Sequence, residues 1–286
     1  MELQNMDILE RIHASYYQLT ATEKKVADYV LVNHARVQFM SITQLADECG
    51  TADATISRFC KSLQLKGFNA FKLELAKHTA TASVADTISQ KAADWDTPEG
   101  RCREVGRLNQ EAVSQTIELV DHSAVNKAVT LFEKAGKVLS MGAGGSMIMA
   151  SDFAHLFSTV SGKFFAVADS HLQMSAAATM NPGDVVVLLS YSGATTNGLQ
   201  ILELAKARGV STVLITRYPK SPAAKLADVV LLCGSNESPV QQGSVRAKVA
   251  QLVVMDILFQ EYCCRNREAC EDNLQSIASA LTGMHL

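Results

Sequence analysis

A chain of 286 residues is long enough for two domains, since one domain usually holds about 100 to 200 residues. Hydrophobic residues make up 48% of the chain and charged residues 19%, which provides material for a buried core and excludes a largely disordered protein. The net charge of −3 excludes a surface that is basic throughout, although nucleic-acid binding requires only one basic face.

No apolar run reaches the ~18 residues that indicate a membrane span, and the first residues lack the basic-then-apolar layout of a signal peptide. We therefore expect a cytoplasmic protein without a membrane partner. The seven cysteines form no C-x-x-C pair, and an odd number in a cytoplasmic chain is typical of reduced, mostly buried thiols. We expect no disulfide, no zinc or other metal, and no cofactor.

Helical patterns dominate the first eighty residues. Thr20-Ala21-Thr22-Glu23 and Ser41-Ile42-Thr43-Gln44 both match the capping box, in which the first and fourth residues satisfy each other's amides, and each predicts the start of a helix. Gly50 predicts a left-handed C-cap, and a further amphipathic segment follows it at once. Helix, tight turn and helix in this order indicate a helix-turn-helix, whose second helix lies in the DNA major groove.

The second helix of this motif would turn Ile56, Phe59 and Cys60 inward and short polar or basic side chains outward. From Thr55 to Lys77 five basic residues stand against one acidic residue, so this stretch is locally basic. A three-helix module that docks on protein remains an alternative on the pattern alone. The candidate DNA contacts, on the outward side or its margins, are Thr51, Ala52, Thr55, Ser57, Arg58 and Lys61.

The second half of the chain alternates between strand-like and helix-like segments. Two helical segments, about Arg101 to Val120 and Ser123 to Lys134, precede strand candidates that are short and continuously apolar. Strands buried on both faces have this character, and intervening helices such as Gly198 to Arg208 indicate a parallel α/β sheet. The strand candidates are Val138–Met141, Phe164–Val167, Val185–Leu189, Thr212–Ile215 and Val229–Leu232.

Two loops at the carboxyl ends of strands are where a ligand would bind in such a sheet. One is the glycine loop, Gly142-Ala143-Gly144-Gly145-Ser146, and the other is the hydroxyl loop, Ser190-Tyr191-Ser192-Gly193-Ala194-Thr195-Thr196-Asn197. Hydroxyls, a close-turning glycine and the free amides of a following helix are suited to a phosphate monoester. Serines and threonines that merely cap the helix would be the simpler explanation, but four hydroxyls around one glycine exceed what capping requires.

The hydroxyl loop resembles the phosphate loop S-x-S-G-x-T of the sugar isomerase (SIS) domain family, and the resemblance spans roughly Lys137 to Ser235. It implies a flavodoxin-like, three-layer α/β fold. Carried over residue by residue, it implies phosphate contacts from Ser146, Ser190, Ser192, Gly193 and Thr195. A dinucleotide site is the rival, since Gly142-Ala143-Gly144 is followed by Asp169, but Met147 stands where the third glycine of that fingerprint belongs.

Polar residues on neighbouring segments are candidates for the sugar. Asp169 and His171 follow a strand end and either contact sugar hydroxyls or form a helix cap beside an exposed histidine. Glu237 and Arg246 precede a long apolar helix, predicted from Val249 to Tyr262. SIS isomerases use a glutamate as a proton shuttle in this general region, but we favour binding over catalysis for Glu237. The candidate sugar contacts are Gly144, Asp169, His171, Glu237 and Arg246, and no catalytic residue is assigned.

The N-terminal segment from Ser41 to Leu75 resembles the RpiR family of bacterial regulators, on Thr55-Ile56-Ser57-Arg58-Phe59-Cys60-Lys61-Ser62-Leu63 and Lys66-Gly67-Phe68. One departure is Gln64, where relatives lead into Leu-Gly, and this difference bears on the turn. That family joins a helix-turn-helix domain to a SIS domain in this order. The resemblance implies an all-α DNA-binding domain at 1–80, a linker at 81–105 and a SIS domain at 106–286.

The resemblance also implies a sugar-phosphate-responsive transcription factor, usually a repressor, of sugar metabolism genes. We expect a homodimer or homotetramer that binds double-stranded operator DNA, with a sugar phosphate as its effector. A phosphosugar isomerase with an accessory N-terminal domain is the alternative, although a helix-turn-helix would then have no purpose. The sequence identifies neither the sugar nor the operator.

Overall fold

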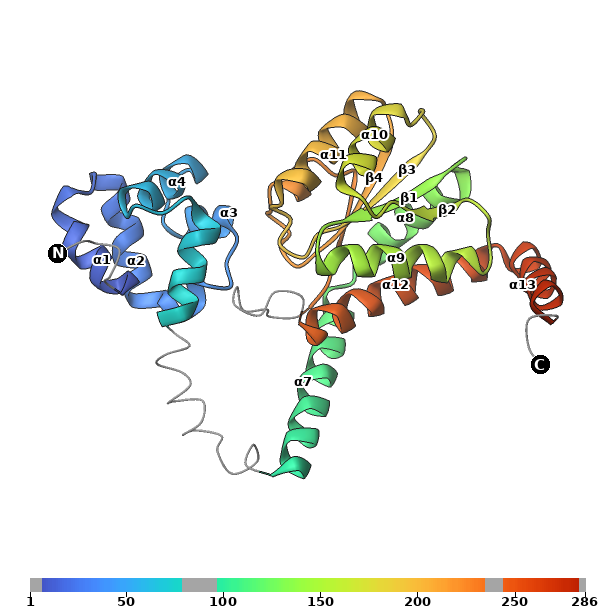
Figure 1. Cartoon of the computed structure of the whole chain (residues 1–286), viewed down its shortest axis with the longest axis horizontal. Helices are drawn as coiled ribbons and strands as arrows, with labels where there is room; N and C mark the ends of the chain where they lie inside the picture. Colours follow the sequence, from blue (N-terminus) through green and yellow to red (C-terminus); the bar gives the residue numbers. More distant parts are fainter. Residues whose placement is uncertain (1–6, 79–96, 235–243, 283–286) are drawn as a thin grey trace. The chain divides into compact units, whose positions relative to one another are not determined.

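The computed structural model describes residues 7–78, 97–234 and 244–282, which form two compact units divided between Gln110 and Glu111 (Figure 1). The linker predicted at 81–105 falls largely outside the described residues, and its last part belongs to helix α7 (Pro98–Leu119). Within the described ranges, no helix combines the length and apolar character of a membrane span.

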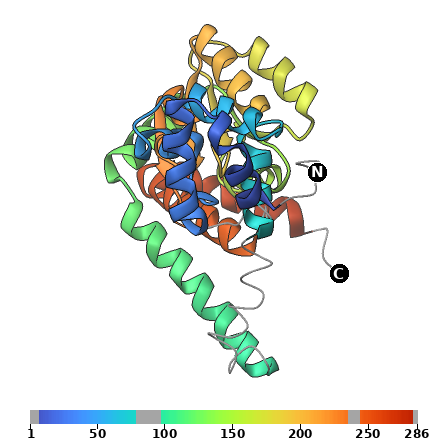
Figure 2. The same cartoon turned by 90° about the vertical axis from the view of Figure 1, so that its left-hand side faces the viewer.

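The described part of the N-terminal unit is helical (Figure 2). Both predicted capping boxes are confirmed: Thr20 with Glu23 opens α2, and Ser41 with Gln44 opens α3. Tight reciprocal hydrogen bonds therefore fix where these two helices begin. The elements are α1 (Ile8–Ser15), the 3-10 turn η2 (Tyr16–Gln18), α2 (Ala21–Val37), α3 (Ile42–Glu48), α4 (Asp53–Ser62) and a further helix over residues 68–78.

The turn between α3 and α4 has the predicted geometry. Gly50 has a φ of 60°, in the left-handed region where glycine meets no Cβ penalty. Ile56, Phe59 and Cys60 of α4 are fully buried, as predicted, and the Phe59 ring meets that of Phe71 edge to face at 5.6 Å. Burying side chains of this size stabilises the unit by about 1.5 to 3 kcal/mol each, so the inward face of α4 holds the helix in place.

The C-terminal unit is built on a parallel five-stranded sheet with the order β2-β1-β3-β4-β5. Every predicted strand is confirmed, each end within one residue of its predicted position. This is the order of flavodoxin-like sheets, and the chain reverses direction across the sheet between β1 and β3. The strands are β1 (Val138–Gly142), β2 (Phe164–Ala166), β3 (Val185–Leu189), β4 (Ser211–Thr216) and β5 (Val229–Leu232).

Helices cover both faces of the sheet, which confirms the three-layer fold. Along β3, Val185, Val187 and Leu189 belong to one apolar cluster, and Val186 and Leu188 belong to the other, as strand alternation requires. One face is covered by α8 (His122–Lys134), α9 (Gly145–Ser158) and α12 (Val245–Arg265), and the other by α10 (Ser170–Thr179), α11 (Thr196–Ala207) and the short turn η3 (Ala223–Lys225).

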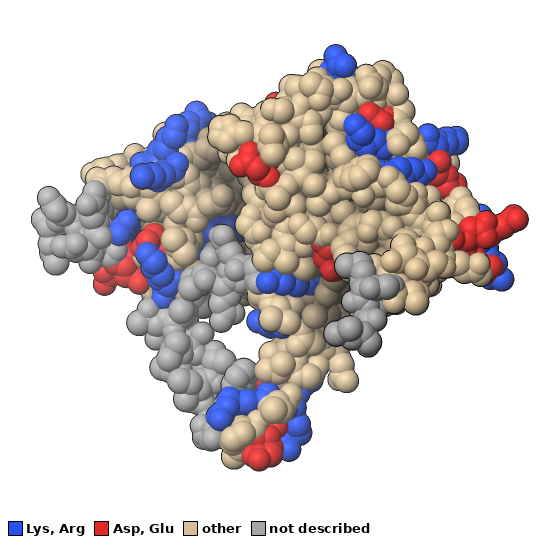
Figure 3. Space-filling view, turned by 45° about the vertical axis from the view of Figure 1, so that its right-hand side comes forward, with Lys and Arg blue, Asp and Glu red and all other residues tan. Residues whose placement is uncertain are grey.

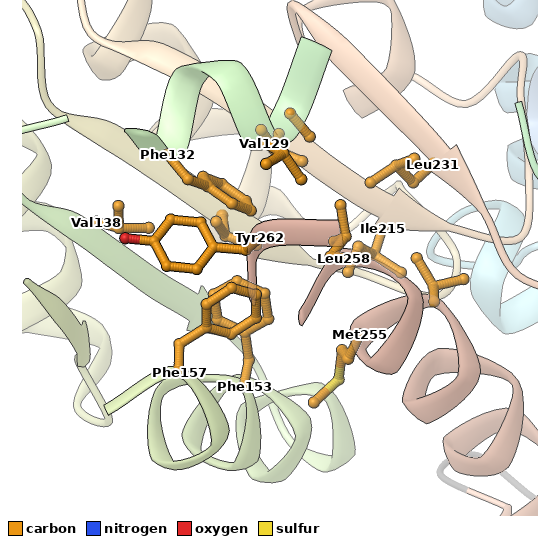
Figure 4. Packing of buried hydrophobic residues seen from close by; sticks show 14 of the residues in the cluster. Val129, Phe132, Val138, Phe153, Phe157, Ile215, Leu231, Met255, Leu258 and Tyr262 are labelled. Atoms are coloured by element: carbon orange, nitrogen blue, oxygen red, sulfur yellow. The ribbon is translucent and has the colours of Figure 1, made fainter. Parts of the chain in front are cut away.

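Aromatic rings fill the first of these clusters (Figure 4). The Phe157 ring of α9 lies 4.5 Å from that of Phe153 and 5.7 Å from that of Tyr262, which comes from α12. Phe132 of α8 approaches both phenylalanines of α9 edge to face, at 5.9 and 5.8 Å. This packing holds α8, α9 and α12 against the sheet. It therefore also holds the start of α9, which follows the loop after β1, in place. A final helix, α13 (Arg267–Leu281), follows α12.

Candidate functional site

The glycine loop and the hydroxyl loop leave neighbouring strands at one edge of the sheet. The last pair of the β1–β3 ladder is Gly142 with Leu189; the glycine loop begins at Gly142 and the hydroxyl loop directly after Leu189. This is the point where the strand order reverses, and ligands of open α/β sheets bind in the crevice outside the carboxyl ends of strands there. The fold therefore brings together the two loops that the sequence singled out.

The hydroxyl loop turns tightly around Gly193, whose φ is +59° and whose amide donates to the Ser190 carbonyl at 3.1 Å. The Ser190 hydroxyl is buried without a hydrogen-bond partner. The half-buried Ser192 accepts the Ala194 amide at 3.3 Å. Thr195 is exposed at the N-cap of α11 and makes no capping hydrogen bond with its side chain. Its hydroxyl and the first amides of α11 are therefore suited to donate to an anion, which the helix dipole also favours.

A third loop, residues 216–223, holds the backbone of the hydroxyl loop. The Tyr191 carbonyl accepts from the Arg217 amide at 3.0 Å and from the Thr216 hydroxyl at 3.1 Å, and the Gly193 carbonyl accepts from the Ala223 amide at 2.9 Å. A Cβ on Gly193 would lie 2.1 Å from the hydroxyl of the buried Ser221. The third loop carries no recognisable sequence motif, because its contacts with the hydroxyl loop are made largely by backbone groups.

The glycine loop is equally constrained. Gly142 has no room for a Cβ, which would lie 2.8 Å from the Ser146 backbone. Gly144, with a φ of +55°, is the N-cap of α9. The half-buried Ser146 follows in the first turn, and its amide donates to the Ala143 carbonyl at 3.1 Å. Glycine is thus required at Gly142 by space and favoured at Gly144 by backbone conformation.

The candidate sugar contacts have differing surroundings. Asp169 is the N-cap of α10, and its Oδ1 accepts from the Leu172 amide at 2.9 Å. One of its carboxylate oxygens therefore serves the helix. His171 is exposed in the first turn of α10, and Arg246 is half-buried as the second residue of α12. Glu237 lies outside the described residues.

The candidate DNA-binding surface is the outward side of α4. Ala52, Arg58 and Lys61 are exposed, and Thr51 and Ser57 are half-buried. The orientation expected for Thr55 is wrong: this residue is buried, at 5% exposure, and its hydroxyl accepts from Nη2 of Arg58 at 3.3 Å. Threonine carries one methyl and one hydroxyl group and is short enough to be buried on a helix that also has an exposed side.

A buried carboxylate supports this surface from α2. Burial raises the pKa of Glu23, but hydrogen bonds from Thr20 and Ser62, together with the positive charge of Arg58, outweigh it and hold the pKa below its ordinary value. Ser62 Oγ donates to Glu23 Oε1 at 2.9 Å, which ties the last turn of α4 to the start of α2. Figure 3 shows a group of Lys and Arg side chains on the N-terminal unit, with Asp and Glu side chains elsewhere on its visible face. Contacts with DNA phosphates require such basic side chains.

Comparisons with known proteins agree with both halves of this arrangement. Residues 6–82 match the family model of the helix-turn-helix domain, rpiR family, and residues 131–260 match that of the SIS domain. The two modules together define a DNA-binding transcriptional regulator. The chain belongs to the RpiR family of such regulators, with a SIS domain as its second module.

Full-length relatives carry the same description. A Caldanaerobacter subterraneus protein named as an uncharacterized HTH-type transcriptional regulator is 32% identical, over 88% of this chain and 89% of its own. The HTH-type transcriptional regulator HexR of Escherichia coli is 28% identical, over 96% of this chain and 94% of its own. Relatives of this kind identify the chain as a regulator rather than an enzyme.

Solved structures extend the comparison to three dimensions. The Vibrio vulnificus NanR protein complexed with ManNAc-6P has a TM-score of 0.83 and 25% identity, covering 98% of this chain and 100% of that one. The sugar isomerase domain of an RpiR transcription factor from Sphaerobacter thermophilus has a TM-score of 0.57 and 22% identity, covering 62% of this chain and 97% of its own. The second likeness shows the fold alone.

Proposed function

We propose that this regulator represses genes of sugar metabolism and that a sugar phosphate, bound at the carboxyl edge of its SIS sheet, controls operator binding. The observation that carries the proposal is the hydroxyl loop, where a left-handed Gly193 and an α11 without a side-chain cap present hydroxyls and amides to one place. NanR, similar over 98% of this chain, was solved in complex with ManNAc-6P, a sugar phosphate, which supports the same ligand class here.

In this proposal the phosphate contacts are Ser146, Ser190, Ser192, Gly193 and Thr195. The unpartnered hydroxyl of Ser190 supports this role, because a buried hydroxyl without a partner is costly until a ligand supplies one. The sugar contacts are Gly144, Asp169, His171, Glu237 and Arg246, and Asp169 keeps one oxygen for a hydroxyl after capping α10. No residue is given a catalytic role, and no cofactor takes part.

Operator recognition is proposed to require two copies of the chain. A two-fold homo-oligomer places two α4 helices on the half-sites of a palindromic operator, about one helical turn apart or a multiple of it. The effector changes DNA affinity by binding the DNA-competent and DNA-incompetent conformations unequally. Coupling of this kind commonly amounts to about 1 to 3 kcal/mol, which corresponds to roughly 5- to 150-fold in affinity.

A thermal-shift screen tests the ligand class directly. The full-length protein is melted with N-acetylmannosamine 6-phosphate, glucosamine 6-phosphate, glucose 6-phosphate, fructose 6-phosphate and their unphosphorylated sugars. A true effector at a hundred times its dissociation constant adds about 2.7 kcal/mol to the stability of the unit that binds it. Ser192→Ala should lose most of this shift. If no phosphorylated sugar raises the melting temperature of the wild-type protein, the proposal is wrong.

A second experiment tests control of DNA binding. The wild-type protein is titrated onto the upstream regions of its own gene and of the genes beside it, with and without the best ligand from the screen. The proposal requires a change in operator affinity that the unphosphorylated sugar does not produce. Transcription from the same promoter then decides between repression and activation.

A further inference from the structure

A buried glutamine joins the two loops of the candidate site. Gln173, in the first half of α10, has no exposed surface. Its Nε2 donates to the carbonyls of Gly142 and Val167, both at 2.8 Å, and its Oε1 accepts from Nδ2 of Asn197 at 2.9 Å. Nε2 of Gln173 also lies 3.3 Å from the sulfur of Met147, in the first turn of α9. The reversed amide would set Oε1 against two carbonyl oxygens, so hydrogen bonding fixes the orientation of the side chain.

The other three partners of Gln173 lie on three different segments at the carboxyl edge of the sheet. Gly142 ends β1 and opens the glycine loop, Val167 follows the end of β2, and Asn197 stands in the first turn of α11, where the hydroxyl loop ends. A single side chain thus links both loops to α10. Strand pairing between β1 and β3 ends at Gly142 and Leu189. The hydrogen bonds of Gln173 therefore connect the two loops beyond the last pair of hydrogen-bonded strand residues.

Gln173 also anchors α10 itself. Gln173 and Ala177 are the buried residues of this helix, and Met174 and Ala176 pack partly buried against the same apolar cluster as Ala177. The candidate sugar contacts Asp169 and His171 lie at the start of the same helix. The position of these two residues relative to the hydroxyl loop therefore depends in part on the hydrogen bonds of one amide.

We propose that Gln173 is the positioning residue of the effector site, one that sets the glycine loop and the start of α10 at a fixed distance from the hydroxyl loop. The proposal rests on the sugar-phosphate function above. A hexose phosphate must contact the hydroxyl loop with its phosphate and the other segments with its sugar, so its affinity depends on their relative position. Inorganic phosphate has Ser146 as its one proposed contact outside the hydroxyl loop and the first turn of α11, so its affinity depends on Gln173 less.

The test compares two ligands on two variants and a control. Gln173→Met keeps the volume and removes every hydrogen bond, whereas Gln173→Glu keeps an acceptor for Asn197 and replaces the donor by an anionic oxygen. Thr212→Val is the matched control, because Thr212 is also buried and its hydroxyl donates to Asp228 Oδ2 at 2.8 Å, toward the opposite end of the sheet. Calorimetric titration of the full chain measures the affinity for inorganic phosphate and for the best hexose phosphate of the screen.

We expect the Gln173 variants to bind the hexose phosphate about tenfold more weakly or worse, as is usual when a group that orients ligand contacts is removed. Their affinity for inorganic phosphate should change less than threefold, and Thr212→Val should change neither affinity, even where its melting temperature falls as far. If Gln173→Met does not fold, Gln173→Glu decides alone. A folded Gln173 variant with wild-type hexose phosphate affinity, or with equal losses for both ligands, overturns the proposal. Failure of the wild-type protein to bind any hexose phosphate refutes the proposed function instead.

Discussion

Gln64 adopts a backbone conformation that side chains avoid. It follows the end of α4 with a φ of 60°, the only positive φ of a non-glycine residue in the described part of the chain. The Leu65 amide donates to the Cys60 carbonyl at 3.0 Å and the Gln64 amide to that of Lys61 at 2.9 Å, the pattern of a Schellman C-cap. That motif favours glycine at the position of Gln64, so the departure noted in the sequence does bear on the turn.

Gln64→Gly should therefore stabilise the N-terminal unit. Relief of the left-handed strain outweighs the extra flexibility of glycine in the unfolded chain by about 0.5 to 1 kcal/mol. Calorimetric unfolding of the full chain measures the effect. The matched control is Gly50→Ala, since Gly50 has the same φ of 60° and open space around its Cβ position, and it should lose about 1 kcal/mol. A lower melting temperature for Gln64→Gly would contradict this account.

Gly193 is restricted by space as well as by conformation. A Cβ there would lie 2.1 Å from the Ser221 hydroxyl and 2.5 Å from the Ser221 Cβ, and its φ is +59°. Gly193→Ala must therefore displace the hydroxyl loop, and we expect sugar-phosphate affinity to fall at least about tenfold, for about 1.4 kcal/mol or more. Gly162→Ala, where a Cβ meets nothing within 4 Å, is the control. Unchanged binding by Gly193→Ala would remove the loop from the proposed site.

For two residues, Thr55 and Gln173, the sequence did not predict the burial of the side chain. Thr55 was expected near the outward side of α4 and is buried, because a side chain with one methyl and one hydroxyl group fits either side of a helix. Gln173 gave no signal, since a lone glutamine in a helix usually faces solvent. Its role depends on carbonyls 6 and 31 residues away in sequence, which only the folded sheet brings within reach.

At the scale of elements, the strands were more predictable than the helices. All five strands are short apolar runs. Because both faces of the parallel sheet are buried, apolar residues do not alternate with polar ones along these strands, and each strand ends where its apolar run ends. The starts of α2 and α3 were also predictable, because a capping box is a local pattern of four residues. The sequence of α9 contains no capping box and no clear amphipathic period, because residues such as Met147, Ile148 and Phe157 place apolar side chains on several sides of the helix. This helix contacts β1, β2, β3 and α12, and a helical period in the sequence does not reveal these contacts.

The proposed recognition of DNA by α4 belongs to the scale of the element, and substitution of Arg58 tests it. Arg58→Ala should weaken operator binding by about 1 to 3 kcal/mol if the guanidinium reads a base edge, or lower the salt slope by about one if it contacts phosphate. Lys77→Ala removes the same charge from the end of the helix over residues 68–78, where Lys77 pairs with Glu74 at 2.8 Å, and should change binding little. Binding of Arg58→Ala equal to wild type at several salt concentrations would favour a protein-docking module instead.

For the whole molecule, the arrangement of the loops was predictable only in part. Parallel strands imply that loops after their carboxyl ends share one edge, but the order β2-β1-β3-β4-β5 was not readable from local patterns. That order makes β1 and β3 neighbours, and it therefore sets the glycine loop beside the hydroxyl loop. Local chemistry identified the loops, whereas the topology decides that one ligand can contact both.

In a chain that binds both an effector and DNA, each ligand changes the affinity for the other by the same factor. If the effector changes operator affinity by a given factor, operator DNA must change effector affinity by the same factor and in the same direction. Effector titrations with and without saturating operator DNA should therefore yield the fold-change seen in DNA titrations with and without effector, about 5- to 150-fold for ordinary coupling. Unequal factors at equilibrium would mean that the effector also acts on something other than this complex, such as the association of its subunits. Equal factors of one would show that the SIS unit binds its ligand without controlling DNA binding.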